Sequence, residues 1–138
     1  LSFTPWTKPD DYFELLDFVE EFDLIDEVDP VQFAIRLLVP PGSDLLGRES
    51  MQPFIGEMDP ENFIHRWSHP DPRMDRLHEE ILAIAEDAAE KNEDPADTFA
   101  RIRAAAAATL ERPDRAGAAP ALDPGRLRPP RLTESWFC

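Results

Sequence analysis

An apolar run between two proline boundaries constrains the fold of this chain more than any other stretch. Residues Gln32–Val39 read QFAIRLLV, with Pro30 before them and the turn-forming residues 40–42 (PPG) after them. A short apolar run bounded in this way is typical of a strand buried on both faces, as in a parallel sheet flanked by helices. Arg36 is the one charge within it, and we expect it to have an ionic partner because burying an unpaired charge is costly.

The residues before this run predict a helix over about 8–23. Thr7 is expected to cap this helix, and Pro9 suits its first turn. Apolar side chains recur every three or four residues on one face, and acids fill the opposite face. The apolar face consists of Tyr12, Leu15, Leu16, Val19 and Phe22.

Residues 3–6, before that helix, have the character of the end of another strand. The order of strand, helix and buried strand predicts an α/β fold with parallel strands. Two strands cannot form such a sheet alone, so the remainder is expected to come from missing chain or from a partner.

Residues 47–70 predict an irregular segment, because prolines interrupt them repeatedly. Their large apolar side chains are expected to fasten this segment onto the core. These side chains are Phe54, Ile55, Phe63, Ile64 and Trp67.

Two helices and a linker are predicted after this segment. Asp71–Pro72 begins a helix that runs to about residue 90, and Asp94–Pro95 begins a second. Residues 112–130 are rich in proline and predict a semi-stiff linker. The inward faces of the two helices are expected to carry Met74, Leu77, Ile81 and Ile84 on the first, and Phe99, Ile102, Ala106 and Leu110 on the second.

Charge and composition exclude several classes of partner. A net charge of −15 over 138 residues argues against nucleic acid and against anionic membrane surfaces. No apolar run of about 18 residues is present to span a membrane, and no signal peptide is predicted. One cysteine cannot form an internal disulfide, which fits a reducing cytoplasm or an incomplete chain.

The charge is distributed unevenly along the chain. Residues 112–138 carry five arginines and three acids, a net charge of +2. Because the whole chain carries −15, residues 1–111 carry −17. This distribution suggests that the tail lies back on the acidic body. A solvated surface with a floppy end is the favoured alternative.

Local motifs for chemistry are weak. His65 and His69 are four residues apart, which would suit a shared metal on a helix, but Pro70 argues against a helix there, so packing or surface histidines are favoured over a metal site. The PPGS turn lacks the residues of a phosphate loop or a dinucleotide fingerprint. No nearby histidine or basic residue activates Cys138.

Three stretches resemble a known family. The span FTPWTKPDDYFELLDFVEEFDLIDEVDPVQFAIRLLVPPGSDLL resembles the late part of the barrel of a radical S-adenosylmethionine (SAM) enzyme, and WSHPDPRMDRL resembles the segment that follows the barrel in a subgroup. The ending RLTESWFC resembles the point at which CUAEP/CCAEP-tail radical SAM proteins reach their Cys-Cys-Ala-Glu-Pro or Cys-selenocysteine-Ala-Glu-Pro motif. The resemblance covers residues 1–90 and 126–138.

The resemblance implies an α/β fold with three parts. Residues 1–46 would be the C-terminal remnant of a partial (β/α) barrel, 47–111 a loop with a two-helix extension, and 112–138 a linker with a Cys-terminated, Pro/Arg-rich tail. The chain would be the C-terminal part of a longer cytoplasmic enzyme, cut before a selenocysteine codon read as a stop, with an ordinary C-terminus as the alternative.

The resemblance also implies cofactors and site residues. The whole enzyme would use S-adenosylmethionine and a [4Fe–4S] cluster held by a CxxxCxxC motif, whereas this chain has one cysteine and would hold neither. Arg36, Pro41, Gly42 and Ser43 would line the cofactor or substrate cavity at the end of a barrel strand. Arg36 would pair with a carboxylate of cofactor or substrate, or with an acid of the protein, and the structural pair is favoured.

Cys138 would form a vicinal pair with a following Cys or selenocysteine, for redox chemistry, substrate capture or metal binding. The predicted partners are the missing N-terminal part of the barrel and an unidentified substrate. By itself the chain would be inert. The alternative function is a self-standing, acidic, helical protein-interaction module.

Overall fold

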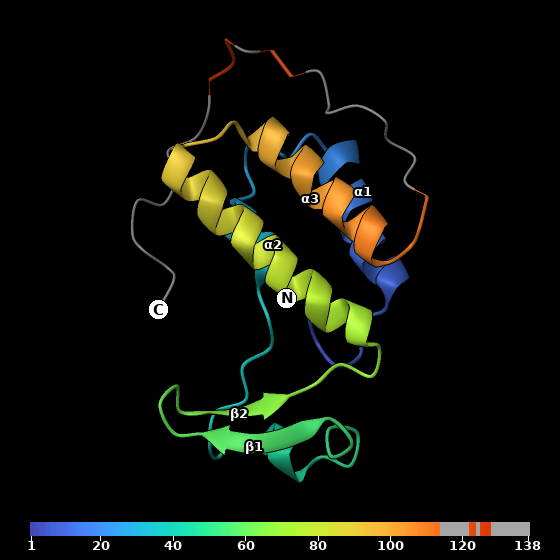
Figure 1. Ribbon diagram of the computed structural model, residues 1–138, viewed down its shortest axis with the longest axis vertical. Coiled ribbons are helices and arrows are strands. Elements are labelled where there is room, and N and C mark those ends of the chain that lie inside the picture. The colour runs from blue at the N-terminus through green and yellow to red at the C-terminus, as the bar shows by residue number, and fades with distance from the viewer. Residues whose placement is uncertain (114–121, 124, 128–138) are drawn as a thin grey trace.

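The computed structural model describes residues 1–113, 122–123 and 125–127, and these form a mixed helical and sheet structure (Figure 1). The helices are α1 (Pro9–Glu21), α2 (Pro72–Lys91) and α3 (Pro95–Thr109), with short 3-10 helices η1 (Pro30–Ala34) and η2 (Asp44–Gly47). Strands β1 (Ile55–Asp59) and β2 (Ile64–Trp67) form an antiparallel pair. We call α1, η1, α2 and α3 the helical region, and η2, β1 and β2 the hairpin region.

Each α-helix has a proline at its first position, where the missing N–H costs nothing. Asp71 caps α2 by accepting the Arg73 amide at 3.0 Å, and Asp94 caps α3 by accepting the Ala96 amide at 2.9 Å. All three predicted helices are confirmed, and their predicted starts, with the predicted ends of the first two, agree with the structure within two residues. The predicted cap of α1 is wrong, because Lys8 occupies that position and Thr7 binds back to Thr4.

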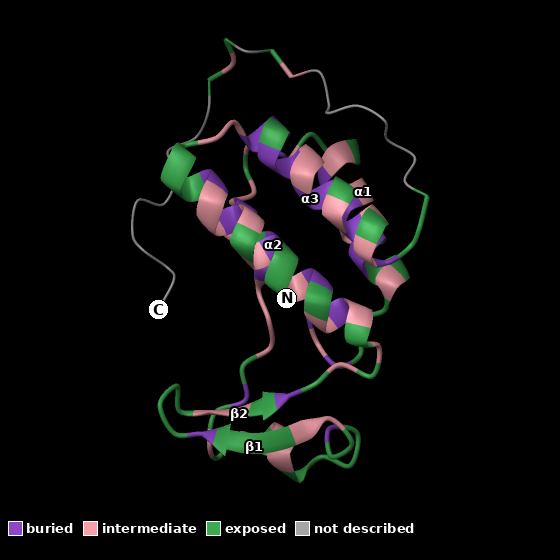
Figure 2. Cartoon of the chain, viewed as in Figure 1, coloured by how far each residue is buried: buried purple, intermediate pink, exposed green. Residues whose placement is uncertain are grey.

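The main core lies between the helices, where the buried residues face one another (Figure 2). Helix α2 packs against both α3 and η1. One predicted core residue of α1, Phe22, is exposed, and Phe13 is buried instead. The buried members of this core are Phe3, Tyr12, Phe13, Leu16, Val19, Ile25, Phe33, Ala34, Met74, Leu77, Ile81, Phe99, Ile102, Ala106 and Leu110.

The predicted buried strand over Gln32–Val39 is wrong. Asp29 accepts the Val31 amide at 3.1 Å and starts η1, so the first residues of the run form a helical turn. The rest is extended and makes one isolated parallel bridge, between Phe3 and Arg36. A strand inside a sheet needs a hydrogen-bonded ladder on each side. In the described residues this stretch makes only the single bridge to Phe3 and, at its end, one backbone bond from the His65 amide to the Val39 carbonyl. Leu38, expected to be buried, is exposed.

The segment predicted to be irregular contains a β-hairpin. Met58 pairs with His65 and Asp59 with Ile64, and the register is irregular between Met58 and Ile55. Asp59 organises the connection, because its carboxylate accepts the Glu61 and Asn62 amides and the Arg66 side chain. Asp and Asn favour tight turns through such side-chain bonds, so Asp59 and Asn62 were the sequence signal for a hairpin, and the prediction of an irregular segment overlooked it.

The hairpin region has a small core of its own rather than a place on the main one. Its buried residues are Val39, Met51 and Trp67, with Phe54 and Ile55 packed against them. Phe63, also expected to fasten this segment, is exposed.

The described residues of the tail contact the helical region. Arg112 donates to Asp10 at 2.6 Å and lies over the ring of Phe13, Leu122 packs against the main core, and Arg126 is ion-paired with Asp26. For these residues the tail lies back on the acidic body, as the charge distribution suggested. The rest of the predicted linker lies outside the described residues.

None of the helices in the described part of the chain is both long enough and apolar enough to cross a membrane.

Candidate functional site

The best-formed cluster of polar contacts among the predicted site residues surrounds Arg36. Its Nη1 donates to Oδ1 of Asp75 at 2.8 Å and its Nη2 donates to the Trp67 carbonyl at 2.7 Å. The guanidinium also lies over the Trp67 ring, 3.7 Å from the ring centroid. The charge in the apolar run therefore has both an ionic partner and an aromatic face, which together offset its partial desolvation.

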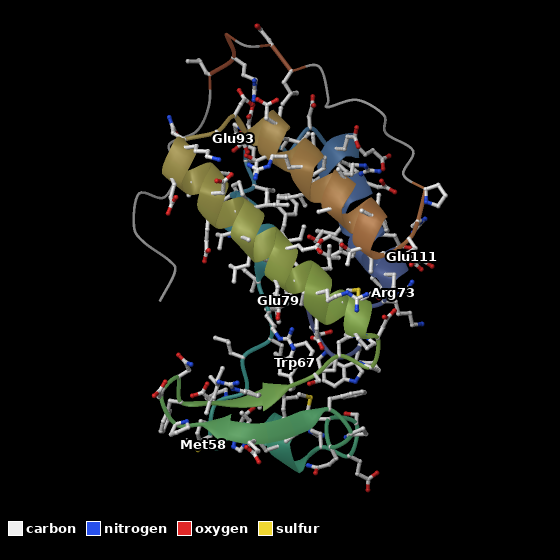
Figure 3. All side chains as sticks on the ribbon, viewed as in Figure 1. Met58, Trp67, Arg73, Glu79, Glu93 and Glu111 are labelled. Atoms are coloured by element: carbon white, nitrogen blue, oxygen red, sulfur yellow. The ribbon has the colours of Figure 1, made fainter. Side chains whose placement is uncertain are left out.

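This cluster joins the two regions of the molecule. Arg36 follows η1, Asp75 lies in the first turn of α2, and Trp67 ends β2. Trp67 lies where the hairpin meets the helices (Figure 3). Its indole N–H donates to the Leu37 carbonyl at 2.7 Å, so the indole is fixed at both its face and its edge. We call Arg36, Trp67 and Asp75 the joint.

His69 extends the joint toward α1. Its amide donates to Oδ2 of Asp75 at 3.0 Å, so both carboxylate oxygens of Asp75 are occupied. Its ring Nδ1 accepts the Asp71 amide at 2.9 Å, so the neutral ring carries its proton on Nε2 and donates it to the Thr7 carbonyl at 2.8 Å. Both ring nitrogens are thus engaged by the backbone, as the packing interpretation of this histidine predicts.

The other two histidines lie in different surroundings. His65 lies in β2, where its amide donates to the Val39 carbonyl at 2.7 Å. His78 meets Phe3 edge-on, and burial, followed by the nearby charge of Arg36, lowers the pKa of its imidazole. No group of three or more His, Cys, Asp or Glu side chains in the described residues is arranged to hold a metal ion.

The turn after the apolar run has a defined geometry. Gly42 has a φ of +84°, a value that favours glycine, and the Ser43 amide donates to the Pro40 carbonyl at 3.1 Å. The Ser43 hydroxyl accepts the Leu45 amide at 3.3 Å and so caps η2. Pro41, Gly42 and Ser43 thus form the entrance to η2. The Arg36 side chain instead donates to Asp75 and to the Trp67 carbonyl.

Cys138, the predicted redox residue, lies outside the described residues. Two features that sequence reading missed are the partners of Arg36 and the ion pairs of Arg126. A partner for Arg36 was expected, but its choice among many acids depends on tertiary packing. The uneven charge of the tail was the signal for Arg126.

The chain has no match among protein-family models, curated proteins or solved structures.

Proposed function

We propose that this chain is the C-terminal part of a radical S-adenosylmethionine enzyme of the CUAEP/CCAEP-tail type. In this proposal residues 1–46 are the end of a partial (β/α) barrel, residues 47–111 are an extension, and residues 112–138 lead to a Cys-containing tail. The whole enzyme would cleave S-adenosylmethionine reductively and start radical chemistry on an unidentified substrate. The cytoplasm is the fitting location, because its thiols stay reduced.

The parallel bridge between Phe3 and Arg36 is the observation that carries the proposal. The amides of Ser2 and Phe3 both donate to the Ile35 carbonyl at 3.0 Å, and the Leu37 amide donates to the Phe3 carbonyl at 2.8 Å. The connection between the two segments includes α1. A parallel pair joined through a helix is the repeating unit of a (β/α) barrel.

The exposure of apolar side chains beside this bridge also supports the proposal. Leu1 and Leu38 each lie two residues from a bridged residue and are largely exposed. Further barrel strands and helices would cover such side chains. An extended edge left open is otherwise a site for aggregation.

The proposal gives roles to the predicted site residues. In the whole barrel, the extended residues after η1 would pair with further strands. Barrel strands direct their carboxyl ends toward the active site, so Pro41, Gly42 and Ser43 would lie at the rim of the cavity. Arg36, with its charge already paired to Asp75, would hold the rim to the extension. Cys138 and a following Cys or selenocysteine would serve redox chemistry, substrate capture or metal binding.

The cofactors of the proposed enzyme do not fit this chain alone. The CxxxCxxC cluster motif requires three thiolates, and the chain contains one cysteine. The cluster would therefore be held by residues outside this sequence, together with S-adenosylmethionine. By itself the chain is expected to be inert.

The coding sequence on both sides of this chain tests the proposal. We expect an in-frame CxxxCxxC motif upstream, and a Cys or selenocysteine codon followed by Ala-Glu-Pro downstream. The protein translated from that longer frame should cleave S-adenosylmethionine under anaerobic, reducing conditions, whereas the 138-residue chain should not. A start codon at Leu1 together with a true stop after Cys138 would refute the proposal.

An acidic interaction module remains the second candidate, because an exposed aromatic pair lies at the C-terminal end of α1. Phe18 and Phe22 are 51% and 58% exposed, and their ring centroids are 4.7 Å apart. Glu14 and Glu21 are exposed on the same helix. A module of this kind should melt cooperatively as a monomer, whereas a barrel fragment should aggregate or melt over a broad range.

A further inference from the structure

The tail returns to the helical region through a tight turn that presents Arg126. The Arg126 amide donates to the Asp123 carbonyl at 3.1 Å and closes the turn. The Gly125 amide donates to the Asp123 carboxylate at 2.9 Å, which fixes the turn from the side. Leu122, just before the turn, packs against the main core. We call the four residues Leu122, Asp123, Gly125 and Arg126 the anchor turn.

The Arg126 guanidinium binds between two carboxylates, those of Asp26 and Asp94, and we call this pair of acids the notch. Its Nε and Nη2 donate to the two carboxylate oxygens of Asp26, the second at 2.8 Å. Nη2 also donates to Asp94 at 2.8 Å, and Nη1 donates to the Asp123 carbonyl at 3.1 Å. All three guanidinium nitrogens are thus engaged, and the side chain is only 15% exposed.

The two acids of the notch come from different elements. Asp26 lies in the loop between α1 and η1, and Asp94 lies between α2 and α3. Asp94 cannot turn away from the notch without giving up its cap, because the same oxygen accepts the Ala96 amide. Both carboxylates bind the same guanidinium, which offsets their mutual repulsion. The planar fork binds Asp26 through two nitrogens while it also reaches Asp94, a two-point geometry that an ammonium group does not provide.

We propose that the notch between Asp26 and Asp94 is a binding site for an arginine-bearing turn, and that its occupant is the chain's own anchor turn. Leu122 and Arg126 are the recognition residues. Docking is reversible and intramolecular, so the short connection from α3 gives the anchor turn a high effective concentration at the notch. A partner's arginine would have to displace it. This inference is independent of the proposed enzyme function.

The first test measures hydrogen exchange of the Gly125 and Arg126 amides in the full chain. Arg126→Gln should speed their exchange by about tenfold or more, and Arg126→Lys should give an intermediate rate because it keeps the charge but loses the fork. Arg48→Gln, the same charge change at an exposed arginine beside η2, should have no effect. Unchanged exchange in Arg126→Gln, with the helices intact by circular dichroism, would overturn the proposal.

The second test supplies the occupant in trans. A peptide of residues 120–130 is titrated into the Leu122→Ala/Arg126→Gln variant and into the wild type, while amide resonances of Asp26 and Asp94 are followed by NMR. The variant should bind the peptide about tenfold or more tightly than the wild type, whose notch is occupied in cis. A peptide with glutamine in place of Arg126 should not bind. Equal binding to both proteins, or binding away from these two resonances, would contradict the proposal.

Discussion

The helical region and the hairpin region are stabilised in different ways. The main core of the helical region contains fifteen buried residues packed among three helices, whereas the core of the hairpin region contains Val39, Met51 and Trp67 beside a two-stranded pair. An isolated two-stranded hairpin is marginal in water. The hairpin therefore depends on its attachment at the joint, where Arg36 ties Trp67 to Asp75.

The difference shows how one chain combines apolar and polar stabilisation. Burial of apolar area is the main driving force for the helical region, and it needs no particular partner for each side chain. The hairpin region buries too little apolar area to be stable alone, and specific polar contacts at Arg36 supply the missing stabilisation. Damage to the helical region should therefore be global, and damage to the hairpin should be local.

The largest effect is expected from Leu77→Ala in the main core. Leu77 is fully buried in α2, and its truncation should lower the free energy of unfolding by about 3 kcal/mol. Urea denaturation followed by circular dichroism measures this loss. Met51→Ala removes a fully buried side chain from the hairpin core and is the matched control. It should speed hydrogen exchange in β1 and β2 while α2 keeps its protection, and equal global losses would refute the comparison.

The next effect is expected at the joint. Arg36→Met should destabilise the attachment of the hairpin by about 2 kcal/mol, because Asp75 and the Trp67 carbonyl lose their donor. Hydrogen exchange of β2 and Trp67 fluorescence measure it.

A double variant separates charge from packing at the joint. Arg36→Met/Asp75→Asn leaves no unpaired carboxylate, so it should be more stable than Arg36→Met alone. If the double variant is the less stable of the two, the joint does not depend on the ion pair.

A smaller effect, of opposite sign, is expected from Phe63→Asn in the hairpin connection. Phe63 has a φ of +55° and is 64% exposed, so its ring contributes little packing while its backbone is strained. Asparagine tolerates this conformation, and the change should stabilise the hairpin by about 0.5 kcal/mol. Phe63→Ala keeps the Cβ and should show no gain. Exchange rates of the β1 amides decide between these outcomes.

The smallest effect concerns pH and the cap of α2. The hydrogen bond from the Arg73 side chain lowers the pKa of Asp71 from 3.8 to about 2. A lowered native pKa means that this carboxylate stabilises the fold above its unfolded pKa, and that the contribution is lost as the pH falls from about 4 to about 2. Asp71→Asn keeps a capping side chain but removes the charge. The difference in melting temperature between wild type and variant should shrink over that window, and a constant difference would show that Asp71 adds no pH-dependent stability.

Much of the helical region could be predicted from the sequence. Aspartate followed by proline marks the starts of α2 and α3, and apolar spacing identifies most of their buried residues. The candidate site could be predicted only in part. Arg36 was expected to have an ionic partner, but the sequence did not indicate which acid it would be. Asp75 lies 39 residues further along the chain, and local patterns carry no information about a contact at that separation.

The sequence by itself determined the three helices, their caps at α2 and α3, and the charge contrast between body and tail. These are local properties, fixed by spacing, capping and composition within a few residues. Tertiary structure decided whether QFAIRLLV becomes a strand. Its nearly continuous apolar character suits a buried strand. A strand forms only where a neighbour supplies a hydrogen-bonded ladder, and among the described residues Phe3 alone bridges to Arg36. Tertiary structure likewise decided which acids bind Arg36 and Arg126, because each ion pair joins residues that are distant in the sequence and meet only in the folded chain.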